Sequence, residues 1–156
     1  PDSLKYQTKK LARTVYGGGG IMPDFFVPID TTQYTDYHRN IVAKGVVIKT
    51  TMKFIESHRK ELQSKYKKFE TFNDKFEISD EILANMQTLA EQEKIKFDEK
   101  QYQKSLPLIK TQLKALIARD LWDMNEYFQI MNTTDSSVLQ ALKVLNEGAY
   151  EKVVRL

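Results

Sequence analysis

The stretch from Asp36 to Glu70, DYHRNIVAKGVVIKTTMKFIESHRKELQSKYKKFE, decides the fold class of this chain. Apolar residues recur along it at steps of three and four, which is the spacing of one face of an α-helix. Arg59 is the one polar residue on that face, and Val46-Val47 locally favours a strand instead. Because good helix formers dominate the stretch, the spacing predicts one long helix over residues 36–70. Its buried face is expected to consist of Ile41, Gly45, Ile48, Met52, Ile55, Leu62, Tyr66 and Phe69.

Three further helices are predicted after a break at Asn73-Asp74. Ser79 is placed to cap a helix over residues 80–93. Asp98, with Gln101 three residues later, resembles a capping box and begins a helix that runs to about residue 120, and another is expected to continue directly to about residue 131. The side chains expected to face inward are Ile82, Leu83, Met86, Leu89, Ala90, Ile109, Leu113, Leu116, Ile117, Leu121, Met124, Phe128 and Met131.

Pro107 lies inside the helix predicted from Asp98 to about residue 120, so it predicts a kink or the start of the second half of that helix. Asp135 is placed to cap a final helix, and Gly148 is placed to end it. Residues 150–156 are expected to add one more turn. The apolar face of the final helix is expected to consist of Val138, Leu139, Leu142, Val144 and Leu145.

The first 32 residues differ in composition from the rest. They contain the run Gly17–Gly20, and Arg13–Tyr16 has strand composition. Short extended pieces are expected at residues 21–24 and 25–29, confined to sheet edges by Pro23 and Pro28. This segment is too short and too interrupted to build a core. We therefore expect it to be disordered or to pair with a neighbouring molecule, rather than to form a sheet within one chain.

These patterns predict a mainly α fold: a helical bundle of about four to five helices with an N-terminal extended or short-strand arm. The expected domains are residues 1–32, an arm with a Gly-rich turn, and residues 33–156, a helical domain. The chain begins with Pro1-Asp2 and contains neither a signal peptide nor a long apolar run. We therefore expect a fragment cut from a longer polypeptide, without a membrane span.

The composition narrows the classes of function. The 156 residues are 41% hydrophobic and 29% charged, which suits a folded domain with a solvated surface. The net charge is only +3, and its densest basic clusters, Lys9-Lys10 and Lys65-Lys67-Lys68, do not form the stripe of a nucleic-acid-binding protein. The sequence has no cysteine, which excludes disulfides and thiolate metal sites.

No catalytic, cofactor-binding or metal-binding residue is predicted from the sequence. The run Gly17–Gly20 lacks the Gly-Lys-Ser/Thr of a phosphate loop. His38 and His58 are not in a metal-ligand motif, and Ser57 and His58 are adjacent on a helix and therefore point apart.

Two clusters leave an alternative open. Asp120, Asp123 and Glu126 share a helical face, where a solvated stripe with Arg119 paired to a neighbour competes with an acid–base pair. Core packing competes with a ligand pocket for Trp122, Met124, Tyr127, Phe128 and Met131. The polar residues Tyr127 and Asn132–Asp135 are expected to cap the turn between two helices.

The stretch Arg13–Asp24, RTVYGGGGIMPD, resembles the end of the catalytic domain in C-terminal processing (tail-specific) serine peptidases. In that family a Gly-Arg step leads into Gly-Ile-x-Pro-Asp, whereas Ala12 stands before Arg13 in this sequence. Residues 26–32 look like the exit from the protease core. The helical part resembles the C-terminal extension of long members through Phe69, Phe72, Phe76, Ile117–Arg119, Leu121-Trp122, Asn132, Asp135 and Ala141-Leu142.

The resemblance implies a serine endopeptidase with a Ser/Lys dyad and a PDZ module, both preceding this segment in the parent protein. Lys9, Lys10 and Lys44 are therefore not proposed as the catalytic base, and the chain alone is expected to be inactive. The implied partners are the catalytic and PDZ modules of its own parent chain and the parent's protein substrates, with self-association into a homo-oligomer and no nucleic acid. The implied location is the periplasm or cell envelope of a bacterium.

A second reading of the same residues remains open. The stripe from Ile48 to Phe69 also suits a free-standing helical adaptor that binds a partner helix or peptide, with residues 1–32 as a flexible arm. A longer gene that encodes the Ser and Lys motifs upstream would count against this reading.

Overall fold

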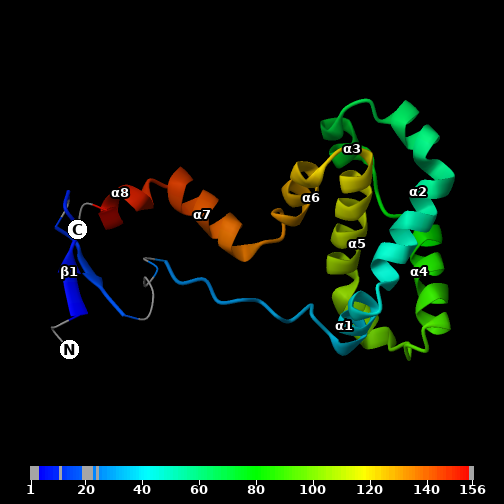
Figure 1. Cartoon of the computed structure of the whole chain (residues 1–156), viewed down its shortest axis with the longest axis horizontal. Coiled ribbons are helices and arrows are strands. Elements are labelled where there is room, and N and C mark those ends of the chain that lie inside the picture. Colours follow the sequence, from blue (N-terminus) through cyan, green and yellow to red (C-terminus); the bar gives the residue numbers. More distant parts are fainter. Residues whose placement is uncertain (1–3, 11, 19–22, 24, 155–156) are drawn as a thin grey trace. The chain divides into compact units, whose positions relative to one another are not determined.

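The computed structural model describes residues 4–10, 12–18, 23 and 25–154, with only the backbone described at 152–154. Within these ranges the chain is mainly helical, with eight helices and a short two-stranded arm, which confirms the predicted fold class (Figure 1). Ile21, Met22, Asp24 and the last two glycines of the Gly17–Gly20 run lie outside the described residues. The elements are β1 Lys5–Gln7, β2 Thr14–Tyr16, α1 Asp36–Ala43, α2 Val46–Lys65, α3 Phe69–Lys75, α4 Asp80–Gln92, α5 Glu99–Leu121, α6 Met124–Met131, α7 Ser136–Asn146 and α8 Ala149–Val154.

Two compact units divide the chain. Residues 30–135 form one, which we call the helical unit. Residues 1–29 and 136–156 form the other, which we call the split unit because the helical unit separates its two segments in the sequence. The expected division was at residue 32, with everything after it in one domain; in the structure the last 21 residues group with the arm instead.

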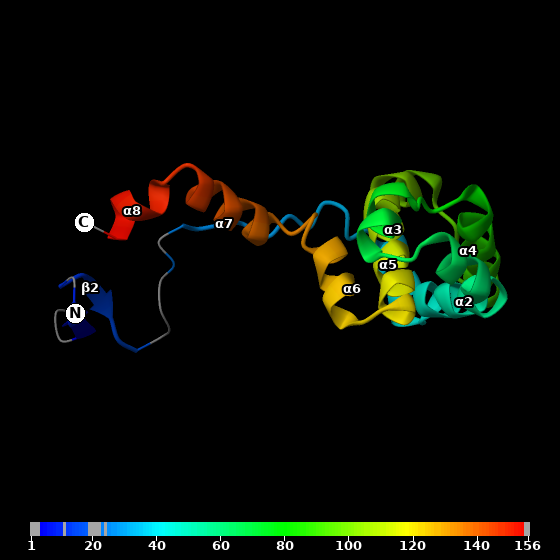
Figure 2. The same cartoon turned by 90° about the horizontal axis from the view of Figure 1, so that it is seen from above.

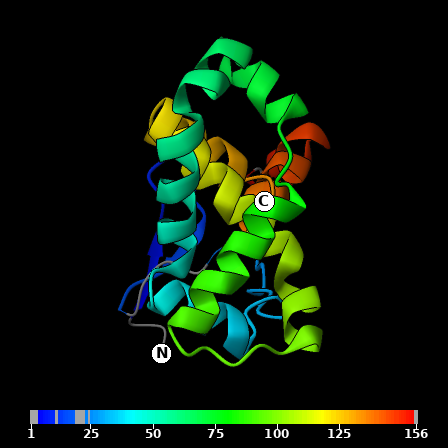
Figure 3. The same ribbon diagram turned by 90° about the vertical axis from the view of Figure 1, so that its right-hand side faces the viewer.

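In the helical unit, α5 lies between α6 on one side and α2 on the other (Figure 2). Helices α1 and α2 both contact α5, and α4 contacts α2. Figure 3 views the unit from the side on which α2 and α4 lie, where α3 joins the end of α2 to the chain that returns to α4. The fully buried side chains of α5 are Ser105, Ile109, Leu113, Ala115, Ile117 and Ala118.

The single helix predicted over residues 36–70 is wrong, because the chain breaks at Gly45. This residue has φ of +69°, in the left-handed region, so the right-handed helix cannot continue through it. Helix α1 ends at Ala43, and the Gly45 N–H donates to the Val42 carbonyl at 2.9 Å. The turn is typical of a helix C-terminus that uses glycine.

The break changes which face of α2 is buried. Ile48 and Met52 were expected in the core but are 46% and 65% exposed. Val46, Val47, Thr50 and Thr51 are buried instead, because the helix restarts with a new register after Gly45. The two buried threonine hydroxyls donate to carbonyls one turn earlier in the same helix, so their burial leaves no donor unsatisfied.

An aromatic cluster closes the end of the unit around α3. Tyr66 and Phe72 meet edge to face with ring centroids 5.4 Å apart, and Phe72 stacks on Phe76 at 4.6 Å. Trp122 adds an edge contact with Phe69 at 5.9 Å. The predicted break at Asn73-Asp74 is wrong, since both residues lie inside α3. The preceding helix ends at Lys65, and extended backbone at Lys68 precedes α3.

The predicted caps of the next two helices are confirmed. The Ser79 hydroxyl accepts from the Ile82 N–H at the start of α4, and the Asp98 carboxylate accepts from the Gln101 N–H at the start of α5. Helix α5 continues through Pro107 to Leu121. A new helix, α6, then begins at Met124 with Asp123 as its cap, so the two helices do not run on directly.

Polar contacts fix the segment before α1 on the side of α5. The hydroxyls of Thr35 and Ser105 lie 2.7 Å apart, and the Ser105 hydroxyl is 2.6 Å from the Gln33 carbonyl oxygen. The Gln101 side-chain oxygen accepts from the Tyr37 N–H at 2.8 Å. These bonds satisfy polar groups that packing against α5 removes from water.

The arm of the split unit contains an antiparallel hairpin, with Lys5 opposite Tyr16 and Gln7 opposite Thr14. The expectation that these residues form no sheet within one chain is therefore wrong. Ala12 turns the hairpin with φ of +48°, and its N–H donates to the Thr8 carbonyl at 3.0 Å. All side chains of both strands are exposed.

Helices α7 and α8 complete the split unit. Gly148, at φ of +63°, separates them, as predicted. The apolar face predicted for α7 is buried only at Val144; Leu139, Leu142 and Leu145 are 48%, 52% and 62% exposed. The prediction is wrong for these three because neither segment of the split unit supplies enough surface to cover them.

We predict that Gly45→Ala destabilises the helical unit by about 1 kcal/mol, because a residue with a Cβ is strained at positive φ. A Cβ at Gly45 would meet no atom within 4 Å, so the backbone alone causes the loss. Trp122 is the single tryptophan and reports on this unit, so urea unfolding followed by its fluorescence measures the change. Gly148→Ala, an equally open left-handed site in the split unit, is the control and leaves that transition unchanged. An unchanged midpoint for Gly45→Ala contradicts the prediction.

Candidate functional site

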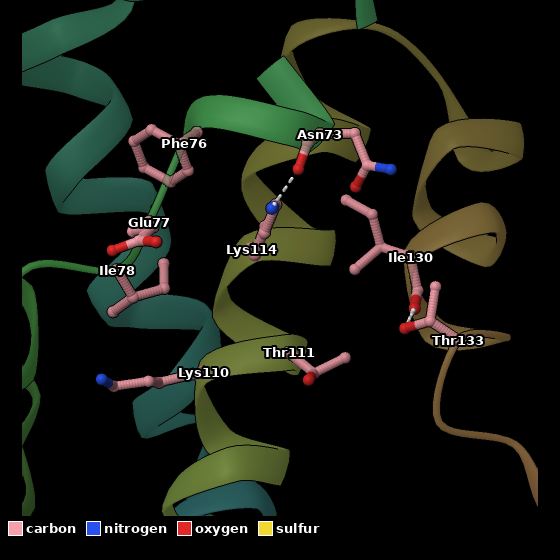
Figure 4. Close-up of a pocket in the computed structure, with 9 residues that line it drawn as sticks. All are labelled: Asn73, Phe76, Glu77, Ile78, Lys110, Thr111, Lys114, Ile130 and Thr133. Atoms are coloured by element: carbon pink, nitrogen blue, oxygen red, sulfur yellow. Dashed lines mark hydrogen bonds between the residues drawn. The ribbon is translucent and has the colours of Figure 1, made fainter. Parts of the chain in front are cut away.

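A cleft of about 410 Å³ lies between α5, the end of α6 and the link from α3 to α4 (Figure 4). Phe76, Ile78 and Ile130 give it apolar walls, and Lys114 of α5 points towards the end of α3. The full lining consists of Asn73, Phe76, Glu77, Ile78, Lys110, Thr111, Lys114, Ile130 and Thr133.

Lys114 is the best-anchored charged group of the cleft. Its Nζ donates to the Asn73 carbonyl at 2.6 Å, and the Phe72 ring lies 6.0 Å from the same atom. Burial lowers the pKa of the Lys114 ammonium below its usual value, and the carboxylates of Glu77 and Asp74 oppose that shift. Because Asn73 is in the last turn of α3, its carbonyl lacks a partner within the helix. Lys114 therefore caps α3 with a positive charge at its C-terminal end.

The two threonine hydroxyls of the cleft also bond within the fold. The Thr111 hydroxyl donates to the Pro107 carbonyl at 3.0 Å, and the Thr133 hydroxyl donates to the Ile130 carbonyl at 2.7 Å. Two lysines and one carboxylate line the cleft, so the charge is close to balanced. Its lining contains no nucleophile beside a base. Lys114 and Thr133 thus bond the last turns of α3 and α6, and Thr111 bonds within α5, which are structural uses.

The structure separates the two histidines. His38 is buried, its Nε2 lies 2.9 Å from the Gln112 side-chain oxygen, and its Nδ1 has no hydrogen-bond partner among the described residues. His58 lies 3.0 Å from the Phe54 carbonyl and stacks on the Phe54 ring. The neighbouring Ser57 hydroxyl turns to the Lys53 carbonyl at 3.4 Å. Within the described ranges no three His, Asp or Glu side chains group to hold a metal ion.

The three carboxylates predicted to share a face have different roles. Asp120 accepts from Arg59 at 2.6 Å and ties α2 to the end of α5, which explains the polar position in the apolar stripe. Asp123 caps α6, and one buried oxygen of Glu126 has no hydrogen-bond partner among the described residues. These contacts favour the structural alternative over an acid–base pair.

The aromatic and methionine residues at the end of α5 and in α6 are only partly in the core. Trp122, Tyr127 and Met131 pack against the core, whereas Met124 and Phe128, expected to be buried, are about half exposed. Helix α6 buries Ile130 instead. The Thr133 and Thr134 hydroxyls bond the last carbonyls of α6, in agreement with the predicted capping turn.

Sequence reasoning did not identify the buried polar residues Tyr37 and Ser105 or the partly buried Lys114. Ser105 follows Tyr102 by three residues and precedes Ile109 by four, so its place on the buried stripe of α5 was a usable signal. Tyr37 is almost fully buried, and its hydroxyl has no hydrogen-bond partner within the described part of the chain. Burial, with Tyr102 and Glu91 nearby, raises the pKa of Tyr37 to about 12.

Comparison with known proteins gives one match. The model of a family of unknown function, DUF8443, matches residues 37–123, which is more than half of the chain and runs from α1 to the cap of α6. No curated protein and no solved structure matches. None of the described helices is both long enough and apolar enough to cross a membrane.

We predict that Tyr37→Phe leaves the free energy of unfolding unchanged or raises it by up to about 1 kcal/mol, because it removes a buried hydroxyl without a partner. The pKa of Tyr37 is higher in the folded state, about 12, than its ordinary value of 10.0. Ionisation of Tyr37 therefore leaves the stability unchanged below pH 10 and lowers it as the pH rises from 10 through 12. The stability of the natural chain should fall relative to that of Tyr37→Phe across this window.

The measurement is urea unfolding at pH 7 and at several values from pH 9 to 12, followed by Trp122 fluorescence. Tyr34→Phe, which removes an exposed hydroxyl near α1, is the control at pH 7. A loss above 1 kcal/mol in Tyr37→Phe at pH 7 would show that the hydroxyl has a partner, whereas parallel pH curves for the two proteins would show that the pKa of Tyr37 is not raised.

Proposed function

We propose that this chain, which belongs to the DUF8443 family of unknown function, is the non-catalytic C-terminal region of a C-terminal processing serine endopeptidase. In this proposal the helical unit packs on or regulates the protease core of the same polypeptide and contributes to self-association. The Ser/Lys dyad and the PDZ module belong to the part of the parent protein that precedes this segment.

The observation that carries the proposal is the stretch Arg13–Asp24 and its resemblance to the end of that protease core. The conformation of the preceding residue supports it. The family has a glycine before the Arg, and Ala12 at this position adopts φ of +48°, a conformation that glycine favours. The backbone conformation at Ala12 would therefore also suit the glycine that the family has at this position.

A second candidate, a helical adaptor, has support from α2. Ile48 and Met52, one turn apart, are 46% and 65% exposed. Beside them is a groove of about 830 Å³ that Met52 and Ile55 line together with Arg59 and Asp120. An exposed apolar pair beside a groove suits an amphipathic helix of a partner, but it suits the protease core as well.

The peptidase proposal predicts that the 156-residue chain does not hydrolyse an unstructured protein, whereas the full-length polypeptide of the parent open reading frame does. Cleavage of a reduced and alkylated protein, followed by mass spectrometry, is the measurement. A full-length variant with its predicted nucleophilic Ser changed to Ala is the matched control. Hydrolysis by the chain alone, or a parent reading frame without the Ser and Lys motifs, refutes the proposal.

The adaptor alternative predicts that amphipathic peptides selected by phage display on the chain bind the exposed face of α2. Met52→Asp should then weaken their binding at least about tenfold, since it places a charge in an apolar contact. Lys53→Asp, the neighbouring exposed position, is the control. Equal affinities for the two variants would rule out this face as the binding surface.

A further inference from the structure

The split unit has almost no core of its own. Among its described residues only Val144 is buried. Its sheet consists of two strands of three residues each, exposed on both faces. An isolated two-stranded hairpin is marginally stable in water, so this unit requires further packing.

The arm and the last two helices nevertheless share a surface. A groove of about 580 Å³ is lined from the arm by Pro23 and Phe25–Val27, and from α7 and α8 by Ser137, Gln140, Ala141, Val144, Leu145 and Tyr150. The two segments that line it precede and follow the whole helical unit in the sequence. The packing of the arm in this groove therefore also affects the packing of α7.

Helix α7 has a second apolar face away from this groove. Leu139 and Leu142 are three residues apart, about half exposed, and not among the residues that line the groove. Lys143 is the only charged residue of α7, whose sequence is SSVLQALKVLN. A helix that is apolar on opposite sides belongs in the interior of a larger packed structure.

We infer that the split unit is part of the protease core and that Leu139 and Leu142 of α7 pack against the remainder of that core. The helical unit is then an insertion between two segments of the core, rather than a domain appended to its end. This inference rests on the proposed function, because that function makes the arm the end of the core sheet. It adds an intramolecular interface that the resemblance did not assign to α7.

The first test examines whether the arm and α7 pack together. The natural sequence has no cysteine, so Val27→Cys with Ala141→Cys introduces a unique pair across the groove. We expect a short bismaleimide to cross-link this pair at least about tenfold faster than Val27→Cys with Lys143→Cys, which uses a residue of α7 that does not line the groove. Equal rates overturn the inference, whether or not the parent proves to be a peptidase.

The second test examines what covers Leu142, in the full-length polypeptide. Leu142→Asp should lower the temperature at which half of the hydrolytic activity is lost by at least about 3 °C, because it places a charge in a packed face. Lys143→Asp, the adjacent exposed position, should change it by less than about 1 °C. If Leu142→Asp does not fold, Leu142→Ala should give a smaller shift in the same direction.

Three outcomes overturn the inference for this face. Equal inactivation temperatures for the variants at Leu142 and Lys143 show that the core does not cover it. A full-length dimer that Leu142→Asp converts to a monomer, with unchanged thermal inactivation, shows that a second copy covers it. A parent polypeptide without peptidase activity removes the proposed occupant together with the proposed function, while the cross-linking test still decides whether the arm and α7 pack together.

Discussion

Burial of helix α5 is the interaction on which the helical unit depends. Ile109, Leu113 and Ile117 are completely removed from solvent, and α5 contacts α1, α2 and α6. Burying an aliphatic side chain of this size contributes about 2 kcal/mol relative to leaving it exposed. Ser105 on the same helix adds a polar link to the segment before α1. The family match covers this arrangement from Tyr37 to Asp123, so it coincides with most of the part of the chain that has a real core.

Much of this fold follows from local rules that a sequence displays. Ser79 and Asp98 are short polar residues directly before helical patterns, and both accept the backbone bonds expected of caps. Gly45 illustrates the limit of such rules. Periodicity counts it as one more step of a stripe, whereas its left-handed backbone ends one helix and starts another in a new register. The exposure of Ile48 and Met52 follows from that single torsion angle, which no count of apolar residues contains.

The polar interior was harder to foresee. Lys114 is one of 24 lysines and arginines, and only its position opposite the last turn of α3 distinguishes it. Arg59 was visible as an exception on an apolar stripe, but its partner Asp120 lies 61 residues away and is known only from the packing of α2 on α5. The burial of the leucines in the split unit was wrongly predicted for a related reason. Its leucines follow a helical spacing, but spacing cannot say whether anything in the same chain covers them.

The connectivity of the helical unit has a mechanical consequence. The chain enters it after Ile29 and leaves it at Asp135, and both connections lead to the split unit. A domain on one tether rotates freely about that tether, whereas a domain held by two loses much of this freedom. The helical unit is therefore expected to have less orientational freedom than a domain on one tether. A pull on either connection would also be transmitted through the packed helices to the other.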